Sequence, residues 1–175
     1  MNESKLSLTT KVARVAMVLV ALVAALAALQ ALSAQPAQAS SFSKIAFESH
    51  RDGNPEIYTM NSNGTDIRRL TSNSAIDEEP SVSADGSKIA FESFRNNNWD
   101  IYTMNSNGSD LRRITGNSAP DRQPSLSPDG TKIVYTSTRD NGSGEIYSIN
   151  STPNSAGSWD FRRLTFNSVI DRNPG

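Results

Sequence analysis

A repeat with a period of 44 residues constrains the fold of this chain more than any other feature. The segment EIYTMNSNGTDIRRLT, residues 56–71, returns as DIYTMNSNGSDLRRIT at residues 100–115, and a third version runs from EIYSIN to DFRRLT within residues 145–165. Each copy contains short runs of β-branched and aromatic residues. A period near 44 with this content predicts a four-stranded β-unit per repeat, as in propeller blades, and disfavours helical solenoids.

Turn residues divide each repeat into four short strands. The first is PSVS (80–83) or PSLS (124–127), the second is KIAFES or KIVYTS, the third is EIYTMN or a close variant, and the fourth contains two arginines. Asn63-Gly64 separates the third strand from the fourth in the first repeat, and the second repeat has the same dipeptide there. Because both residues tolerate positive φ, Asn-Gly strongly indicates a tight hairpin. We therefore expect an antiparallel sheet in each repeat.

The expected strands carry apolar residues on both faces of the pleat. In EIYTMN, Ile57 points to the opposite side from Tyr58 and Met60, and KIAFES shows the same alternation. One sheet cannot bury both of its own faces, whereas stacked sheets cover each other. We therefore expect the hydrophobic core to lie between neighbouring repeats.

Composition excludes several classes of function. The chain of 175 residues has a formal net charge of -1 at pH 7 and interspersed acids and bases, so it has no strong positive field for binding nucleic acid. It contains no cysteine, which excludes disulfides, thiolate nucleophiles and cysteine-based zinc sites. No G-x-S-x-G motif, the usual nucleophile elbow of α/β-hydrolases, occurs in the sequence. We predict no catalytic residue and no enzyme activity in this chain.

Residues 1–39 differ in kind from the rest of the chain. Basic residues precede an uncharged apolar run at 15–29, and the tripeptide AQA follows at 37–39. This order is typical of a secretory signal peptide, so we expect a signal-peptide helix, cleavage after Ala39 and a mature chain in the periplasm or outside the cell. The alternative is an uncleaved membrane anchor, because the apolar stretch approaches the ~18 to 20 residues that span a bilayer.

Several motifs recur together and in phase over residues 43–174: P-S-x-S-x-D-G-x-K-I-x-F/Y-x-S, R-D/N-x-N, E/D-I-Y-x-M-N and R-R-L/I-T. This combination resembles the TolB-like six-bladed β-propeller repeat family. The resemblance implies an all-β domain at 40–175 with TolB-type propeller blades at about 43–71, 80–115 and 124–165. Six blades of this period need roughly 260 residues, so about three four-stranded blades are present and we expect an incomplete ring.

The same resemblance implies a non-enzymatic binding scaffold that takes a protein, cell-envelope or small-molecule partner at the loop mouth of the propeller. It implies contact with a membrane only through the signal peptide. The alternative is a truncated propeller domain of a prolyl oligopeptidase-like or dipeptidyl peptidase-like serine hydrolase whose catalytic domain is missing. A nucleophile elbow encoded downstream in the gene would favour that alternative.

Three aspartates in phase are the candidate binding residues. Asp77, Asp121 and Asp171 each stand three residues before a proline, in the loops AIDEEP, APDRQP and VIDRNP. These loops return the chain toward the propeller axis, so one carboxylate per blade could form a ring at the mouth that binds a partner or calcium. The structural alternative is an Asx turn that fixes each loop before its proline. We expect no cofactor other than calcium.

Three stacked blades would leave the two outermost faces uncovered. We expect Ile45 and Phe47 on one face and Ile133, Tyr135 and Tyr147 on the other. Monomers rarely expose apolar patches of that size, so the sequence predicts self-association, most simply as a two-fold pair of half-propellers.

Overall fold

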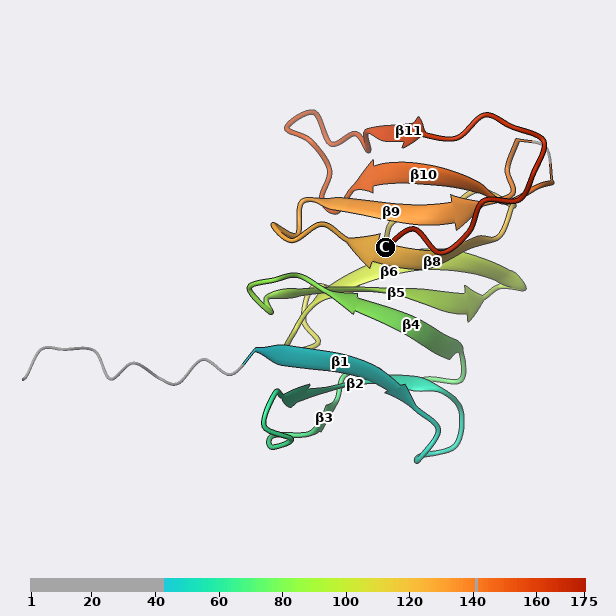
Figure 1. Cartoon of the computed structure of the whole chain (residues 1–175). Coiled ribbons are helices and arrows are strands. Elements are labelled where there is room, and N and C mark those ends of the chain that lie inside the picture. Colours follow the sequence, from blue (N-terminus) through green and yellow to red (C-terminus); the bar gives the residue numbers. More distant parts are fainter. Residues whose placement is uncertain (1–42, 141) are drawn as a thin grey trace, which may run out of the picture. The chain divides into compact units, whose positions relative to one another are not determined.

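The computed structural model describes residues 43–140 and 142–175. The predicted signal peptide, residues 1–39, lies outside the described residues. Within them the chain is all-β, and eleven strands form three antiparallel sheets that do not close into a ring, as the sequence predicts (Figure 1). The first sheet has three strands and the other two have four each.

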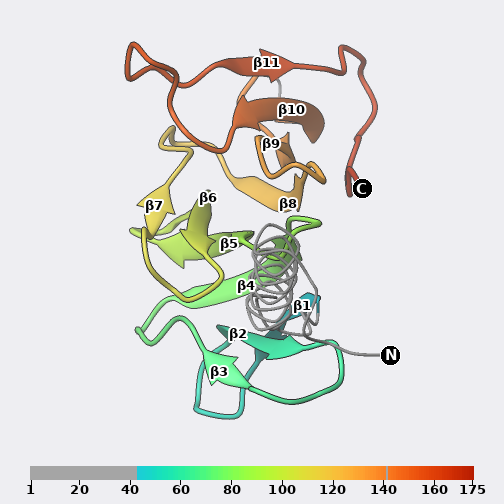
Figure 2. The same cartoon turned by 90° about the vertical axis from the view of Figure 1, so that its left-hand side faces the viewer.

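The sheets follow one another along the chain, one repeat to each sheet. The first contains β1 (Lys44–Ser49), β2 (Glu56–Asn61) and β3 (Arg68–Arg69). The second contains β4 (Ile76–Val82), β5 (Lys88–Arg95), β6 (Asn98–Asn105) and β7 (Arg112–Arg113), and the third contains β8 (Asp121–Leu126), β9 (Lys132–Ser137), β10 (Glu145–Asn150) and β11 (Phe161–Arg163). Each sheet is a meander of neighbouring strands, and the three sheets stack in chain order (Figures 1 and 2).

The predicted hairpins form where Asn-Gly dipeptides occur. Gly64 has a φ of 81°, which only glycine adopts without strain, and its N–H donates to the carbonyl of Asn61 at 2.8 Å. The side chain of Asn63 accepts the N–H of Thr65 at 3.1 Å. The turn therefore satisfies its own polar groups and connects β2 to β3.

The hydrophobic core lies between the sheets, as predicted. Ile57, Ile89 and Phe91 belong to the cluster between the first two sheets, and Tyr102 and Met104 complete it. A second cluster fills the space between the second and third sheets, with Ala90, Ile101, Ile114, Leu126, Ile133, Tyr135, Tyr147 and Ile149. One face of the second sheet therefore packs on the first sheet, and its other face packs on the third.

The prediction that Ile133, Tyr135 and Tyr147 form an uncovered outer face of the third sheet is wrong. Ile133 and Tyr135 are fully buried and Tyr147 is 1% exposed, because these side chains point back toward the second sheet and form part of its cluster. The large apolar side chains that remain exposed in the third repeat come from β11 and the segment after it, among them Phe161 and Phe166.

The first strand of each four-stranded sheet begins earlier than expected. β4 starts at Ile76 and β8 at Asp121, whereas the sequence suggested strands from the prolines onward. A β-bulge explains the difference, because the pairing register shifts between Glu78 and Ser81 and Glu79 has a φ of 50°. The bulge removes the following proline from the hydrogen-bond ladder, so the strand continues past a residue that has no N–H.

The paired arginines of the outer strands have two different roles. The second arginine of each pair reaches a buried acid at the start of the third strand, as Arg113 reaches Asp100 at 2.6 Å. The first arginine lies outside, and in the first two sheets it pairs locally, as Arg112 pairs with Asp110 at 2.7 Å. One arginine therefore anchors the short outer strand while the other stays in solvent.

Candidate functional site

Asp77 and Asp121, two of the three candidate aspartates, are fully buried. Asp77 accepts hydrogen bonds from Ser93 and Asn73, and Arg95 lies 3.4 Å from its carboxylate. Asp121 has the corresponding partners one repeat later, Asn117 at 2.6 Å and Arg139 at 3.1 Å. Each carboxylate is thus bound within its own repeat by an amide and an arginine.

Asp171 occupies a more open position than the other two. It accepts a hydrogen bond from Asn167 at 2.7 Å, and its N–H donates to the carbonyl of Gly144 at 2.8 Å. The Asx turns in these loops are made by asparagines four residues before the aspartates, as when Asn117 accepts the N–H of Ala119 at 2.8 Å. The aspartates then hold the amide groups of those asparagines.

Among residues 43–140 and 142–175, no three His, Asp or Glu side chains are grouped so that they could hold a metal ion. Calcium binding at Asp77, Asp121 and Asp171 stays a prediction from the sequence. Its chemistry would have to compete with the arginines that already neutralise the first two carboxylates.

A second set of in-phase residues connects neighbouring sheets. The glutamate near the end of KIAFES reaches the bulge of the next sheet. There a residue of positive φ directs its backbone N–H toward the preceding sheet. Glu92 accepts the N–H of Gln123 at 2.6 Å, and Glu48 accepts the N–H of Glu79 at 3.1 Å. The same carboxylate position therefore joins the first sheet to the second and the second to the third.

The junction between the second and third sheets also contains a cation. Arg122 donates to Glu92 from Nε at 3.0 Å and from Nη2 at 2.5 Å, and its guanidinium lies 4.2 Å from the ring centroid of Trp99. Trp99 in turn packs against Phe94, with ring centroids 5.2 Å apart. Two aromatic rings and an ion pair fill this junction.

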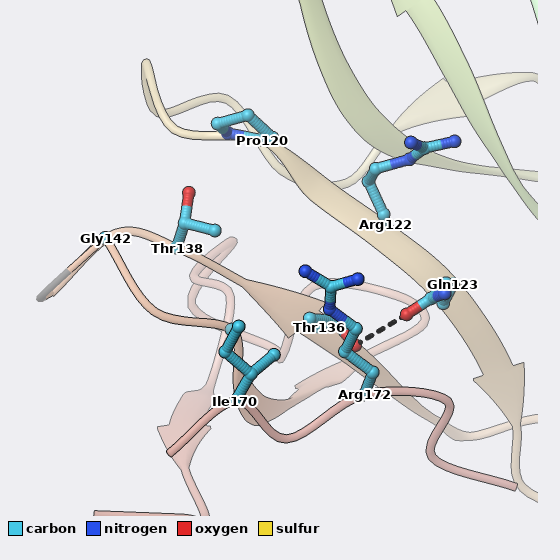
Figure 3. Close-up of a pocket in the computed structure, with 9 residues that line it drawn as sticks. Pro120, Arg122, Gln123, Thr136, Thr138, Gly142, Ile170 and Arg172 are labelled. Carbon is cyan, nitrogen blue, oxygen red and sulfur yellow. Dashed lines mark hydrogen bonds between the residues drawn. The ribbon is translucent and has the colours of Figure 1, made fainter. Parts of the chain in front are cut away.

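The corresponding positions of the third sheet carry much smaller side chains. In phase with Glu92 stands Thr136, and in phase with Phe94 and Trp99 stand Thr138 and Gly144. A cavity of about 190 Å³ opens beside them. We call it the junction pocket; its lining residues are Pro120, Arg122, Gln123, Thr136, Thr138, Gly142, Gly144, Ile170 and Arg172 (Figure 3).

Gln123 substitutes for the missing carboxylate in the junction pocket. Its Oε1 atom accepts the hydroxyl of Thr136 at 3.1 Å, drawn as the dashed line in Figure 3, and the N–H of Asn173 at 3.3 Å. Asn173 has a φ of 53°, like the bulge residues of the two preceding repeats. The third junction therefore presents the same outward N–H, but a neutral amide accepts it at a longer distance.

Arg172 provides the positive charge of the junction pocket. It is in phase with Arg122, and its side chain extends from the C-terminal segment into the space beside Thr136 and Gln123 (Figure 3). In the part of the chain that the structure describes, its guanidinium has no ion pair and no hydrogen bond. Arg122, in contrast, turns away toward Glu92.

The sequence predictions did not include the junction pocket, although its signal is present. The predicted site residues all recur in phase. The pocket arises where the third repeat differs from the second, at Thr136 and Gly144. Its wall does include Ile170 and Arg172, from the third of the loops expected to carry the binding surface.

Three stacked antiparallel sheets that bury their core between them define a set of β-propeller blades. Residues 10–152 match the family of the TolB beta propeller domain. The chain belongs to this family. No helix in the described residues has the length and apolar character needed to cross a membrane.

Solved structures agree with this assignment. A protein assigned as TolB from Agrobacterium tumefaciens is 26% identical with a TM-score of 0.64, over 75% of this chain and 46% of that protein. TolB from Acinetobacter baumannii is 33% identical with a TM-score of 0.60, over 74% of this chain and 31% of that protein. The present chain thus spans less than half the length of either relative. No curated protein sequence matches it.

A peptidase propeller also has this fold. A puromycin-hydrolysing peptidase from Mycobacterium tuberculosis is 13% identical with a TM-score of 0.52, over 74% of this chain and 20% of that protein. Likeness at that identity extends to the fold alone, and it does not favour the serine hydrolase alternative over a binding scaffold.

Proposed function

We propose that this chain is exported and acts as a non-enzymatic, TolB-like binding scaffold in the periplasm or outside the cell. In this proposal residues 1–39 are the signal peptide and residues 40–175 contain the propeller blades. The junction pocket is the contact site for a protein or cell-envelope partner. The observation that carries the proposal is Arg172, whose guanidinium lies in a pocket without a partner among the described residues.

The chemistry of the pocket wall favours binding over catalysis. Arg172, Thr136 and Gln123 offer a guanidinium, a hydroxyl and an amide, which are groups that recognise a ligand. The nine lining residues include no histidine, cysteine or carboxylate, the side chains that most often act as general acid, general base or nucleophile. Binding sites commonly lie on loops that a rigid scaffold holds in place. This wall combines strand residues, such as Thr136, with loop residues, such as Arg172.

Export and partner contact can be tested together in a Gram-negative host that expresses the full chain. Mass spectrometry of the periplasmic product should find Ser40 at its N-terminus, because the predicted cleavage follows Ala39. A photoreactive amino acid at Ile170, which is 57% exposed at the pocket wall, should then form a discrete adduct with one partner. Leu111, which is 46% exposed beside β7, is the matched control position and should give no adduct of the same mass.

The adduct at Ile170 should disappear when Arg172 is replaced by Gln, because the charge in the pocket is part of the proposed contact. Equal labelling from Ile170 and Leu111 would indicate non-specific collision and would contradict the proposal. Chain retained in the cytoplasm would overturn the proposed location.

A further inference from the structure

Two junctions between sheets and a third, between the third sheet and the C-terminal segment, differ in one functional group. Each presents an outward backbone N–H at a residue of positive φ: Glu79, Gln123 and Asn173. At the first two junctions, a carboxylate of the preceding sheet accepts this N–H. At the third junction the position of that carboxylate holds Thr136, whose hydroxyl is itself a donor to Gln123.

The donors for a carboxylate are nevertheless in place at the third junction. Arg172 is in phase with Arg122, which binds Glu92, and Asn173 is in phase with Gln123, whose N–H also binds Glu92. In the junction pocket, the Arg172 guanidinium has no acidic partner within the described residues. The Arg172 side chain lines the pocket beside Gln123, and the N–H of Asn173 donates to Gln123 itself. A guanidinium with a neighbouring backbone N–H is a typical carboxylate site, because charge-assisted hydrogen bonds are stronger than neutral ones.

We propose that the junction pocket binds a carboxylate group supplied from outside this chain, which takes the place that Glu92 occupies one junction earlier. This inference rests on the proposed function, since it names the chemistry by which the same pocket would recognise its partner. The incoming carboxylate would accept hydrogen bonds from Arg172, from the N–H of Asn173 and from the hydroxyl of Thr136. Gln123 would give up the neutral contacts that its Oε1 atom makes now.

The size of the pocket limits the ligand. A cavity of about 190 Å³ holds roughly six water molecules, each of about 30 Å³, and is smaller than the ~300 Å³ or more of typical sites for drug-sized molecules. A carboxylate with one short side chain fits such a volume. The ligand is therefore either the terminal carboxylate of a peptide or an acidic side chain.

Three small probes distinguish these sources on the purified full chain. N-acetyl-trialanine carries a C-terminal carboxylate, its amide carries none, and N-acetyl-aspartate N-methylamide carries only a side-chain carboxylate. Nuclear magnetic resonance titration should move the backbone amide signals of Asn173 and Gly144 with at least one acidic probe. The trialanine amide should leave both signals in place. If neither acidic probe moves them, or the amide moves them equally, the inference is wrong.

Two arginine variants provide the decisive comparison. Arg172→Gln should weaken binding of the acidic probe at least about tenfold, since removing one charge-assisted hydrogen bond commonly has an effect of that size. Arg162→Gln removes the same charge from an exposed arginine on β11, outside the pocket, and should leave affinity unchanged. An equal loss in both variants would show attraction to overall charge only and would overturn the inference. This titration needs no cellular partner, so it can succeed even where crosslinking fails.

Discussion

The carboxylate of Glu92 accepts the backbone N–H of Gln123 at 2.6 Å, across the boundary between the second and third sheets. Glu92 is fully buried, and Arg122 donates to its other oxygen atom. One side chain therefore satisfies a bulge N–H and an arginine that both belong to the next repeat. This contact explains how a repeat protein fixes the position of one blade on another beyond the packing of apolar side chains.

Glu92→Gln should destabilise the chain more than the same change one repeat earlier. It weakens two charge-assisted hydrogen bonds of a buried carboxylate, one from the half-exposed Arg122 and one from the N–H of Gln123, so we expect a loss of about 2 to 3 kcal/mol in the free energy of unfolding. Glu48→Gln is the matched control, because Glu48 is exposed and, within the described residues, makes only the 3.1 Å hydrogen bond with Glu79. We expect that change to cost less than about 1 kcal/mol. Urea unfolding of both variants checks the difference, and equal losses would contradict this account of the junction.

The environment of Glu48 also indicates that its substitution costs less stability than that of Glu92. Glu78 lies where the later repeat has Arg122, and its pKa is raised by partial burial and by the negative charges of Glu48 and Glu92. The first junction thus places like charges near each other where the second places an ion pair. Neutralising Glu48 also relieves that repulsion.

Removal of the charge should affect stability strongly at one arginine of β7 and hardly at the other. Arg113→Met leaves Asp100 buried without its cation, which should lower the free energy of unfolding by about 2 to 3 kcal/mol. Arg112→Met removes only an exposed pair with Asp110 and should change stability by less than about 0.5 kcal/mol. Thermal melts of the two variants test this, and a similar shift in both would mean that the outer strand is held by general charge alone.

Stability should fall in acid because of the turn aspartates. Hydrogen bonds from Ser83 and from the N–H and hydroxyl of Ser87 lower the pKa of Asp85 to about 2, below that of an unfolded aspartate near 3.9. A group whose folded pKa is depressed contributes its stability above the unfolded pKa and loses it as pH falls through the folded value. We therefore expect a decline between about pH 4 and pH 2.

The corresponding Asp129 has its pKa lowered in the same way, by Ser127 and Thr131. A double variant, Asp85→Asn with Asp129→Asn, should flatten the decline between pH 4 and pH 2 relative to the parent. Urea titrations at pH 2, 3, 4 and 6 measure it. Parallel loss of stability in parent and variant would assign the acid sensitivity to other carboxylates.

Calcium binding remains open to a direct test. The sequence predicts that millimolar calcium raises the melting temperature, because a ligand that binds only the folded state stabilises it by mass action. The triple variant Asp77→Asn, Asp121→Asn and Asp171→Asn should lose this response. A response of equal size in parent and variant would leave the aspartates with their structural role alone, holding asparagine amides and arginines.

Sequence reasoning predicted the fold because the repeat determines it locally and globally. Asn63-Gly64 indicates the hairpin, and apolar residues on both faces of a strand require a neighbour on each side. The bulges were not predicted, because a positive φ at Glu79 or Gln123 depends on the N–H finding an acceptor in another sheet. No local pattern reports such a partner.

The candidate site was predicted only in part. The recurring aspartates attracted attention because they are charged and in phase, yet Asp77 and Asp121 are buried beside arginines of their own repeat. The junction pocket exists instead because Thr136 and Gly144 are smaller than Glu92 and Trp99, the residues at the same positions one repeat earlier. Recognising that requires knowing which residues face each other at the equivalent junction, and this is a property of the structure.

The third junction lacks the carboxylate that the chain supplies at the two earlier junctions. Thr136→Glu restores it, because the same position holds Glu92 one repeat earlier. Thr136→Gln is the matched control, of nearly equal size and without charge. Both variants can be compared with the parent in the titration with the acidic probe that binds, with a thermal melt to establish that each is folded.

The most direct measurement is the affinity of the Thr136→Glu chain for that acidic probe. The new side chain should bind Arg172 and the N–H of Asn173 from within, so affinity should fall at least about tenfold while the melting temperature rises. The Thr136→Gln chain loses the hydroxyl and fills part of the pocket, so it should bind more weakly than the parent but more tightly than the Thr136→Glu chain. A folded Thr136→Glu chain that binds the acidic probe as tightly as the parent would contradict the account.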